Sequence, residues 1–285
     1  MKINIITKKH KHYPLYLKEI AHPPKQLYVI GEPLSDYTPS VTIVGSRKLT
    51  NYGKEVTYRL AYDLAKQGIT VISGLALGAD SIAHQAALDA GGRTIAVLAC
   101  GLDTIYPASH RNLAIQILKQ NGTIISEYPE GMPALKQNFI ARNRLVSGLS
   151  DIVLITEAAE ASGSLVTAKF AIEQNKTVCA VPGQITSGQS VGTNNLIKSG
   201  AMVVTEAQDI LHLLGIQSEV EHKKAVFGDT KEEQLVIDLI QGGITTLDEL
   251  QIKSALEPAL FSQTITMLEI SDKIRPLGGA HWTIK

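Results

Sequence analysis

The chain has 285 residues, of which 44% are hydrophobic and 19% are charged, and its 27 basic side chains balance its 27 acidic ones. This composition is typical of a packed globular protein and excludes the disordered, collagen-like and coiled-coil classes. No apolar run is long enough to span a bilayer or to form a signal-peptide core, which predicts a cytoplasmic protein. The length favours one large domain and a small one.

Charge is unevenly distributed along the chain. Residues 1–37 carry six lysines and three acidic residues, whereas residues 38–219 carry fourteen residues of each sign. Residues 220–285 carry seven basic and ten acidic residues, a net charge of −3. Because no large segment is strongly basic, a site for nucleic acid would have to be a local cluster of cations.

The cysteines and histidines suggest neither a disulfide framework nor a metal site. Cys100 and Cys179 each end a short run of small apolar residues, which predicts buried, reduced thiols. No spacing of histidine and cysteine matches a known ligand motif. We therefore expect no metal and no cofactor.

The first 40 residues are a short N-terminal segment without a diagnostic pattern, and β-branched runs then alternate with amphipathic stretches. The predicted buried strands are 41–44, 70–73, 94–98, 123–126, 151–155, 177–181 and 201–204. The predicted helices are 51–67, 80–90, 109–121, 139–147, 164–175, 193–199 and 206–214. This alternation predicts that residues 41–215 form a Rossmann-like, doubly wound and mostly parallel sheet in an α/β domain.

The pattern changes beyond this domain. Residues 216–229 lose the periodicity and have mixed charge, so we predict a linker. Residues 230–285 contain helical patterns at 231–241, 246–254 and 257–271, followed by the strand-like runs KIRPL and HWTIK. Three helices followed by a hairpin predict a small winged-helix-like domain.

The common nucleotide fingerprints are absent from the predicted sheet. The turn after the first strand reads GSRKLTNYG rather than GxGxxG, which argues against a dinucleotide site. The nearest match to a phosphate-binding loop, at 183–190, has Gln189 in place of the required lysine. An ATPase is therefore not expected.

Two short turns at the expected ligand-binding edge of the sheet suit phosphate instead. In Gly45-Ser46-Arg47, the glycine permits a close approach, the serine donates hydrogen bonds, and the arginine and the following helix N-terminus attract anions. Ser162-Gly163-Ser164 has similar chemistry, with Ser164 as the expected N-cap. Alone, Gly45-Ser46-Arg47 is explained equally well as an ordinary turn, and Ser162-Gly163-Ser164 is explained better as a capping turn. Two such turns at one edge favour a phosphate track.

Residues 136–144, with the sequence KQNFIARNR, are the one concentrated basic run of the predicted sheet domain. Helical spacing places Lys136, Phe139 and Asn143 on one side and Arg142 on another. A cation beside an aromatic ring suits single-stranded nucleic acid, because the phosphates are neutralised while a base stacks on the ring. The alternative is that Phe139 is a core residue and the cations form a solvated face, and the spacing alone does not separate the two.

Several acidic and histidine side chains follow the predicted strands, but their spacing matches no known catalytic arrangement, and no GxSxG elbow is present. We expect them to cap helices or to orient arginines. They are Glu127, Glu157, Asp80, Asp103 and His84.

With these residues the chain resembles the DNA-processing protein A family, also called DprA or Smf. The matching segments lie in order between residues 43 and 201 and include IVGSR, ISGLALGADSIAHQAAL, TIAVLACGLDTIYP, ISEYPEG and FIARNRLVSGLSDIVLITEAAEASGSLVTAKFA. Residues 230–285 resemble the winged-helix-like tail of many members.

The resemblance implies a non-enzymatic, single-stranded DNA-binding recombination mediator that forms homodimers. Such a protein protects incoming DNA and loads RecA recombinase during natural transformation, with single-strand-binding protein as a further partner. The candidate DNA-binding residues are Gly45, Ser46, Arg47, Arg111, Lys136, Asn138, Phe139, Arg142, Ser162, Gly163 and Ser164. The chain departs from many members at Leu77, where they carry a basic residue, so one expected phosphate contact is lost. We expect either a weaker DNA affinity or compensation by Arg111.

A second function class stays open, a nucleotide-processing enzyme of the lysine-decarboxylase-like phosphoribohydrolase type. Residues 157–167 lack the paired glycines of its PGGxGTxxE signature, which favours the binding protein. For the homodimer we expect residues 193–215 to form the interface, because the helix near residue 211 has more apolar residues than one buried stripe needs. The helix 257–270 has no basic residue, so we do not expect the C-terminal domain to read DNA.

Overall fold

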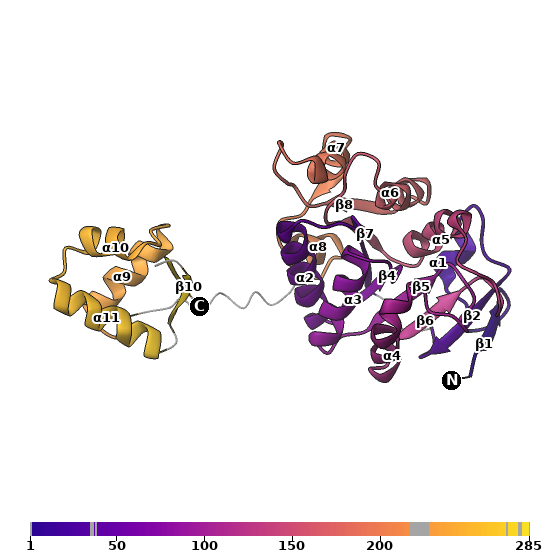
Figure 1. Ribbon diagram of the computed structural model, residues 1–285, viewed down its shortest axis with the longest axis horizontal. Helices are drawn as coiled ribbons and strands as arrows, with labels where there is room; N and C mark the ends of the chain where they lie inside the picture. The colour runs from indigo at the N-terminus through magenta and orange to yellow at the C-terminus, as the bar shows by residue number, and fades with distance from the viewer. Residues whose placement is uncertain are drawn as a thin grey trace. The chain divides into compact units, whose positions relative to one another are not determined.

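The computed structural model describes residues 2–34, 37, 39–216, 228–271, 273–278 and 281–284. The chain divides into two compact units, residues 1–218 and 219–285, which are described separately (Figure 1). The strands of the larger unit are β1 (Asn4–Thr7), β2 (Gln26–Gly31), β3 (Ser40–Val44), β4 (Thr70–Ser73), β5 (Thr94–Leu98), β6 (Thr123–Ser126), β7 (Ile152–Ile155), β8 (Thr177–Ala180) and β9 (Met202–Val203). Its α-helices are α1 (Leu15–Glu19), α2 (Asn51–Lys66), α3 (Ala79–Asp89), α4 (Arg111–Lys119), α5 (Lys136–Gly148), α6 (Gly163–Glu173), α7 (Val191–Lys198) and α8 (Ala207–Leu213).

In the described residues, nine strands form one sheet in the order β1-β2-β6-β5-β4-β3-β7-β8-β9. All pairs among strands β3 to β9 are parallel, while β2 is antiparallel to both β1 and β6. The central strands β3 to β7 are buried along their whole length, which explains why their sequences are continuously apolar or β-branched rather than alternating. The strand order reverses at β3, which has β4 on one side and β7 on the other.

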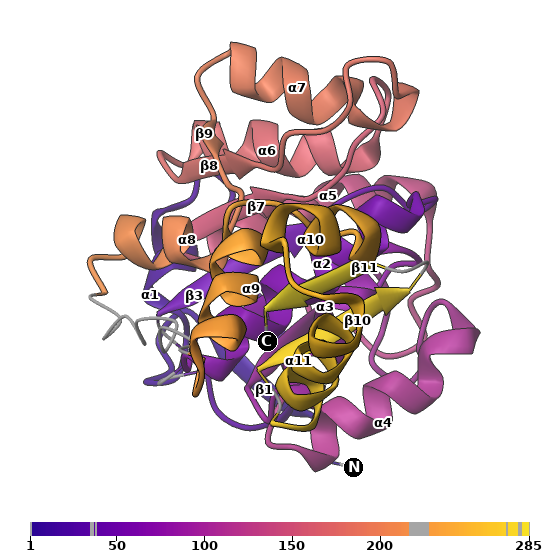
Figure 2. The ribbon, with the colours of Figure 1, turned by 90° about the vertical axis from the view of Figure 1, so that its left-hand side faces the viewer.

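Helices cover both faces of this sheet. Helices α1, α5 and α6 pack on one face, where Leu17, Leu145 and Ala168 belong to one apolar cluster. Helices α2, α3 and α8 pack on the other face with Leu60, Ala83 and other small or branched residues. Figure 2 shows α6 and α8 on opposite sides of β7 and β8. The predicted doubly wound α/β architecture is therefore confirmed.

The N-terminal residues differ from the sequence-based expectation of a separate short segment. Strands β1 and β2 form a hairpin that extends the sheet beyond β6, and α1 packs on α5 (Figure 1). Burial alternates along β2 as it joins the sheet: Leu27 and Val29 are buried, whereas Tyr28 and Ile30 are half-buried. Such a short alternating strand lacks the continuous apolar run that marks the central strands.

The smaller unit contains the predicted three helices and hairpin. Its elements are α9 (Lys231–Gln241), α10 (Leu247–Ser254), α11 (Pro258–Ile270), β10 (Ile274–Gly278) and β11 (His281–Ile284). Phe261, Leu268 and Trp282 belong to its own apolar core. The predicted linker, residues 216–229, lies mostly outside the described residues, which resume at Gly228.

The structure also bears on the cysteines, on membrane spans and on metal sites. Cys100 and Cys179 are buried and free, and burial raises the pKa of the Cys179 thiol to about 12. Within the described ranges, none of the helices combines the length and the apolar character needed to cross a membrane. The same residues contain no cluster of three histidine, cysteine or acidic side chains that could hold a metal ion.

Candidate functional site

A cavity of about 790 Å³ opens at the carboxyl edge of the sheet, where the loops after β3 and β7 lead to helices on opposite faces. This is the point of strand-order reversal, where open α/β sheets bind their ligands. We call this cavity the sheet-edge pocket. Its described lining residues are Val44, Gly45, Ser46, Arg47, Lys48, Ala76, Asp80, Tyr106, Ala134, Lys136, Phe139, Ile140, Arg142, Asn143, Ala159, Ala161, Ser162, Gly163, Ser164, Val166, Thr167 and Gln189.

The pocket brings together both predicted turns and all but two of the candidate DNA-binding residues. Arg111 begins α4, is exposed, and is absent from the described lining of the pocket. Asn138 is buried, and its Nδ2 donates to the carbonyl oxygen of Pro133 at 3.3 Å. Asn138 therefore holds the loop before α5. Leu77 is half exposed and also lies outside the described lining.

Phe139 forms a wall of the pocket. Its half-buried ring lies 5.4 Å from the Cζ of Arg47 and 5.9 Å from the Cζ of Arg142, and the ring of Tyr106 meets it edge-on at 5.4 Å. In the part of the chain that the structure describes, Phe139 belongs to none of the apolar core clusters. Two guanidinium groups lie over this one ring, so an aromatic surface and positive charge are adjacent in the pocket.

Arg142 is a structural cation as well as a lining residue. It is 3% exposed, and its Nη1 donates to the carbonyl oxygens of Gly74, at 2.6 Å, and Val97. Burial lowers the pKa of the Arg142 guanidinium and raises the pKa of the nearby Asp80 carboxyl. The attraction between the two opposite charges acts against both shifts. Arg142 thus ties together the ends of β4 and β5 and positions Phe139.

Asp80 is the one acidic residue among the described residues that line the pocket. Its Oδ2 accepts from the backbone N–H of Gly74 at 3.0 Å and of Ala76 at 3.3 Å. These bonds and the charge of Arg142 occupy the carboxylate. Arg47, Lys48 and Lys136 are exposed, and they leave the pocket with an excess of positive charge.

The N-terminus of α2 does not serve the pocket as predicted. Thr50 caps this helix by accepting from the N–H of Gly53 at 3.1 Å. The buried Glu157 carboxylate accepts from the N–H of Thr50 at 2.8 Å and from its hydroxyl at 2.5 Å. Because a carboxylate already lies at this helix end, its positive potential is neutralised.

Two other helices aim their N-termini at the pocket. Helix α5 begins at Lys136 without a side-chain cap, and α6 is capped by Ser162, whose Oγ accepts from the N–H of Ser164 at 3.4 Å. The expected cap, Ser164, is instead a residue of the first turn. Neither first turn contains an acidic residue. Two helix N-termini beside three exposed cations make a site for anions.

Glycine at 45 and 78 is required by the protein's own packing. Gly78 has φ +81°, and a Cβ there would overlap the carbonyl oxygen of Ser46. A Cβ at Gly45 would lie 2.9 Å from Ala79 and from the carbonyl oxygen of Glu157. The N–H of Ser46 donates to that carbonyl at 2.7 Å. These contacts hold the Ser46 loop at the mouth of the pocket.

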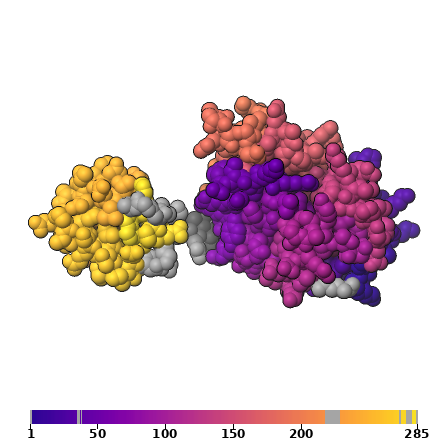
Figure 3. Space-filling model, in the orientation of Figure 1, coloured from indigo at the N-terminus to yellow at the C-terminus, as the bar shows by residue number. Residues whose placement is uncertain are grey.

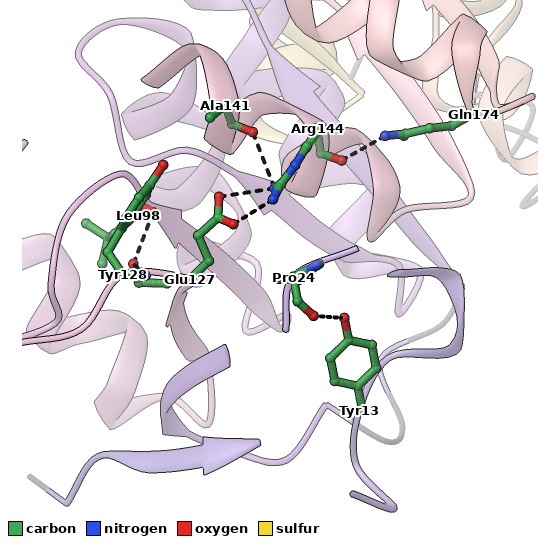
Figure 4. A network of polar contacts seen from close by, with 9 residues as sticks. Tyr13, Pro24, Leu98, Glu127, Tyr128, Ala141, Arg144 and Gln174 are labelled. Atoms are coloured by element: carbon green, nitrogen blue, oxygen red, sulfur yellow. Dashed lines mark hydrogen bonds and ion pairs between the residues drawn. The ribbon is translucent and has the colours of Figure 1, made fainter. Parts of the chain in front are cut away.

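The remaining candidates for catalysis have structural partners. Arg144 donates to both carboxylate oxygens of Glu127, at 3.1 Å and 2.6 Å (Figure 4). Asp103 accepts from the N–H of Gly131 at 3.0 Å, and the fully buried His84 lies with Nδ1 2.7 Å from the Thr94 hydroxyl. Glu127 orients an arginine and Glu157 lies at the start of α2, as expected, whereas Asp103 bonds a loop N–H and His84 bonds a threonine in the core.

Several lining residues were not among the candidates from the sequence, and three of them are Lys48, Tyr106 and Gln189. Lys48 directly follows the predicted tripeptide, and Tyr106 lies in the segment after β5. Gln189, which argued against a phosphate-binding loop, accepts from the Ser46 hydroxyl at 3.3 Å. Their position after parallel strands was a usable signal, because all such segments meet at one edge.

A second cavity of about 600 Å³ is lined by Thr50, Tyr52, Glu157 and Gly183 among others. Its described lining contains no lysine or arginine. A phosphate would therefore find its cationic partners in the sheet-edge pocket and not here.

A doubly wound sheet with a positively charged pocket at its switch point, followed by a winged-helix unit, defines a two-domain protein of the Rossmann type. Residues 4–215 match the family model of DNA recombination-mediator protein A, and residues 221–280 match the DprA winged helix domain. The chain therefore belongs to the DprA/Smf family.

Relatives with known sequences agree with this assignment. Protein Smf of Escherichia coli is 44% identical over 211 residues, which cover 74% of this chain and 56% of that protein. DNA processing protein DprA of Bacillus subtilis is 39% identical over 213 residues, which cover 74% of this chain and 71% of that protein. The chain thus spans little more than half the length of the Escherichia coli relative.

Solved structures show the same fold. The X-ray structure of DprA from Streptococcus pneumoniae gives a TM-score of 0.69 at 37% identity, covering 74% of each chain. DNA processing protein A from Helicobacter pylori gives 0.67 at 37% identity, covering 75% of this chain and 96% of that one. The latter structure is described in terms of its unique single-stranded DNA binding mode.

Proposed function

We propose that this chain binds single-stranded DNA in the sheet-edge pocket and acts as a recombination mediator. In this role it protects incoming DNA and loads RecA recombinase in the cytoplasm during natural transformation, with single-strand-binding protein as a further partner. Family membership supports the role, and the Helicobacter pylori relative supports the ligand. The observation that carries the proposal is the Phe139 ring flanked by Arg47 and Arg142 beside two helix N-termini.

The pocket suits a single strand for a physical reason. A base that has left the stack can lie on the Phe139 ring, while its phosphates face Arg47, Lys136 and the N–H groups of α5 and α6. Bases in a duplex are already stacked on one another. A cavity with an aromatic wall therefore favours the unpaired strand.

The test measures the affinity for a labelled oligothymidylate at ~0.1 M salt. Arg47→Ala and Lys136→Ala should each weaken binding about tenfold, because each removes a charge-assisted phosphate contact. Arg47→Lys should not restore full affinity, because lysine lacks the planar fork of donors. Lys119→Ala, an exposed lysine at the end of α4, is the control. Unchanged affinity in both alanine variants contradicts the site.

The alternative is a nucleotide-processing enzyme on the same sheet. Among the described lining residues the one carboxylate, that of Asp80, is already engaged by two N–H groups and Arg142, which favours binding over acid–base chemistry. Incubation with nucleoside monophosphates, run beside the binding assay, separates the two functions. Base release that is lost in Asp80→Asn would support the enzyme.

The homodimer is also part of the proposal, with its interface in residues 193–215. Leu211 is 2% exposed and belongs to the sheet core, and Leu214 packs against that core, so a charge at either position would disrupt the fold. The exposed apolar residues of this segment are instead Met202 and Val203, on the edge strand β9. Met202→Glu with Val203→Lys should give folded monomer in light scattering, and an intact dimer would contradict this interface.

A further inference from the structure

A basic turn connects β1 to α1. It consists of residues 8–12, with the sequence KKHKH, and Lys8, Lys9, His10 and Lys11 are exposed. Within the described part of the chain, none of its three lysines forms an ion pair. The sequence showed the excess of positive charge in this part of the chain, but the sheet-edge pocket does not use it.

The turn is held in a defined conformation. The N–H of His10 donates to the carbonyl oxygen of Thr7 at 2.9 Å, and the N–H of Tyr13 donates to that of His10 at 3.0 Å. The His10 and His12 rings lie 5.4 Å apart. Tyr13 is buried, and its hydroxyl donates to the carbonyl oxygen of Pro24 at 2.8 Å (Figure 4). The lysines thus project from an anchored turn at the surface, where Figure 3 shows N-terminal atoms in indigo at the margin of the larger unit.

Strand direction places the turn at the same edge as the pocket. Because β2 is antiparallel to both β1 and β6, β1 runs parallel to β6, β5, β4 and β3. The last residue of β1, Thr7, pairs with Gln26, and two residues farther along β2 Tyr28 pairs with Ser126, the last residue of β6. The basic turn therefore follows the carboxyl end of its strand, as the pocket loops follow theirs.

The turn lies within reach of a strand held in the pocket. Five strand spacings of ~4.8 Å separate β1 from β3, a lateral distance of roughly 24 Å. On the way, the carboxylate of Glu127 is compensated by Arg144. Asp103 and Glu130, on the loops after β5 and β6, are the acidic groups that a strand on this route would pass.

We propose that the basic turn is a second phosphate contact for the single strand whose base occupies the sheet-edge pocket. This inference rests on the proposed function. The turn supplies three flexible ammonium groups, which bind phosphodiesters as point charges without reading sequence. It extends the binding site along the sheet edge, so the number of nucleotides held exceeds what the pocket alone accommodates.

The experiment compares two oligothymidylates, of about 4 and about 16 nucleotides, the limits of common single-strand site sizes. The variant is Lys8→Gln with Lys9→Gln and Lys11→Gln in the full chain. It should lose about tenfold in affinity for the long strand and less than twofold for the short one. The slope of log K against log salt for the long strand should fall by up to about 2, since each phosphate contributes ~0.7.

The matched control removes three lysines from the opposite edge of the sheet. Lys66 and Lys119 are exposed residues in the last turns of α2 and α4, and Lys169 is exposed in the C-terminal half of α6. The C-terminal ends of these three helices lie at the amino edge of the strands. Their triple glutamine variant has the same net charge as the test variant. It should bind both strands like the unaltered protein.

Three results would overturn the inference. If the test and control variants bind the long strand with equal affinity, the basic turn makes no contact with DNA. An equal loss for both lengths shows that the turn acts through the fold of the pocket. Unchanged DNA affinity, with loss of binding to vesicles containing phosphatidylserine, assigns the turn to a membrane surface. If the unaltered protein binds neither strand, the proposed function itself fails, which is a different result from selective failure of the turn.

Discussion

The sheet-edge pocket and helix α11 both lie where proteins of similar fold bind nucleic acid, at the carboxyl edge of a sheet and on the third helix of a winged helix. The two surfaces differ in charge. The pocket exposes Arg47, Lys48 and Lys136 beside two uncompensated helix N-termini. Helix α11 contains no basic residue. Lys273, which follows that helix, is paired with Asp229 at 2.7 Å and Glu233 at 3.2 Å. A fold supplies the position of a binding surface, whereas the free cations decide whether a polyanion binds there.

The largest expected effect tests the aromatic wall of the pocket. Phe139→Ala should lower single-strand affinity by about 1–3 kcal/mol, because a stacked base loses its platform. Phe139→Trp should keep most of the affinity, since it preserves an aromatic face. The melting temperature of both variants, measured on the same samples, should change little because the ring lies outside the core clusters of the described residues. Lost stability with normal affinity would make Phe139 a packing residue.

Much of this contrast could be predicted from the sequence, because it depends on local patterns. Continuous apolar runs marked the strands from β3 to β9, and the predicted helices of both units overlap those observed. The Arg47 turn and the basic run were visible as charges placed after strands. The absence of cations from α11 was equally visible.

What could not be predicted depends on the order of strands and on partners distant in sequence. Nothing local shows that Glu157 fills the end of α2, or that Arg142 reaches the carbonyls of Gly74 and Val97. The β1–β2 hairpin was missed because its short strands have exposed residues such as Ile5. The position of the basic turn at the pocket edge follows only from that hairpin.

The next largest expected effect is a difference between the two units in how their stability depends on pH. His84 is fully buried in the larger unit, and burial first, then the charges of His110 and Arg142, lower its pKa from 6.5 to about 3. Its Nδ1 must donate to the Thr94 hydroxyl, because that hydroxyl donates to the carbonyl oxygen of Val71. The folded protein therefore holds the imidazole neutral.

The sign of the pH dependence follows from this shift. Because the unfolded chain binds the proton more tightly, His84 contributes stability above pH 6.5 that is lost progressively as the pH falls toward 3. Between pH 7 and pH 5 the loss should be about 2 kcal/mol. It should be absent in His84→Asn. A loss of the same size in that variant would assign the acid sensitivity to other groups.

Trp282 makes this measurement specific to one unit. It is the one tryptophan of the chain and belongs to the core of the smaller unit. Denaturant curves followed by circular dichroism should shift with pH between 7 and 5, because they report mainly the larger unit. Curves followed by Trp282 fluorescence should not shift. Identical shifts in both signals would show that the two units unfold together.

The smallest expected effect concerns the winged helix. Phosphate contacts of this fold depend on lysine and arginine around its third helix. Helix α11 instead exposes Leu260, Met267 and Ile270, and residues 220–285 carry a net charge of −3. Arg275, exposed on β10, is a single cation and can neutralise one phosphate at most. Such a surface releases too few counterions to bind DNA, and its apolar stripe suits a protein contact better.

Deleting residues 220–285 should therefore leave the affinity for a single strand within about threefold, which is less than ~0.7 kcal/mol. The same deletion combined with Arg47→Ala should match Arg47→Ala alone, since the two surfaces act independently. The isolated fragment should leave duplex DNA unshifted in a gel at low salt, the condition that most favours nonspecific binding by cations. A shift of the duplex that disappears as salt is raised would show that the smaller unit binds DNA through its backbone, and the contrast between the two regions would then be wrong.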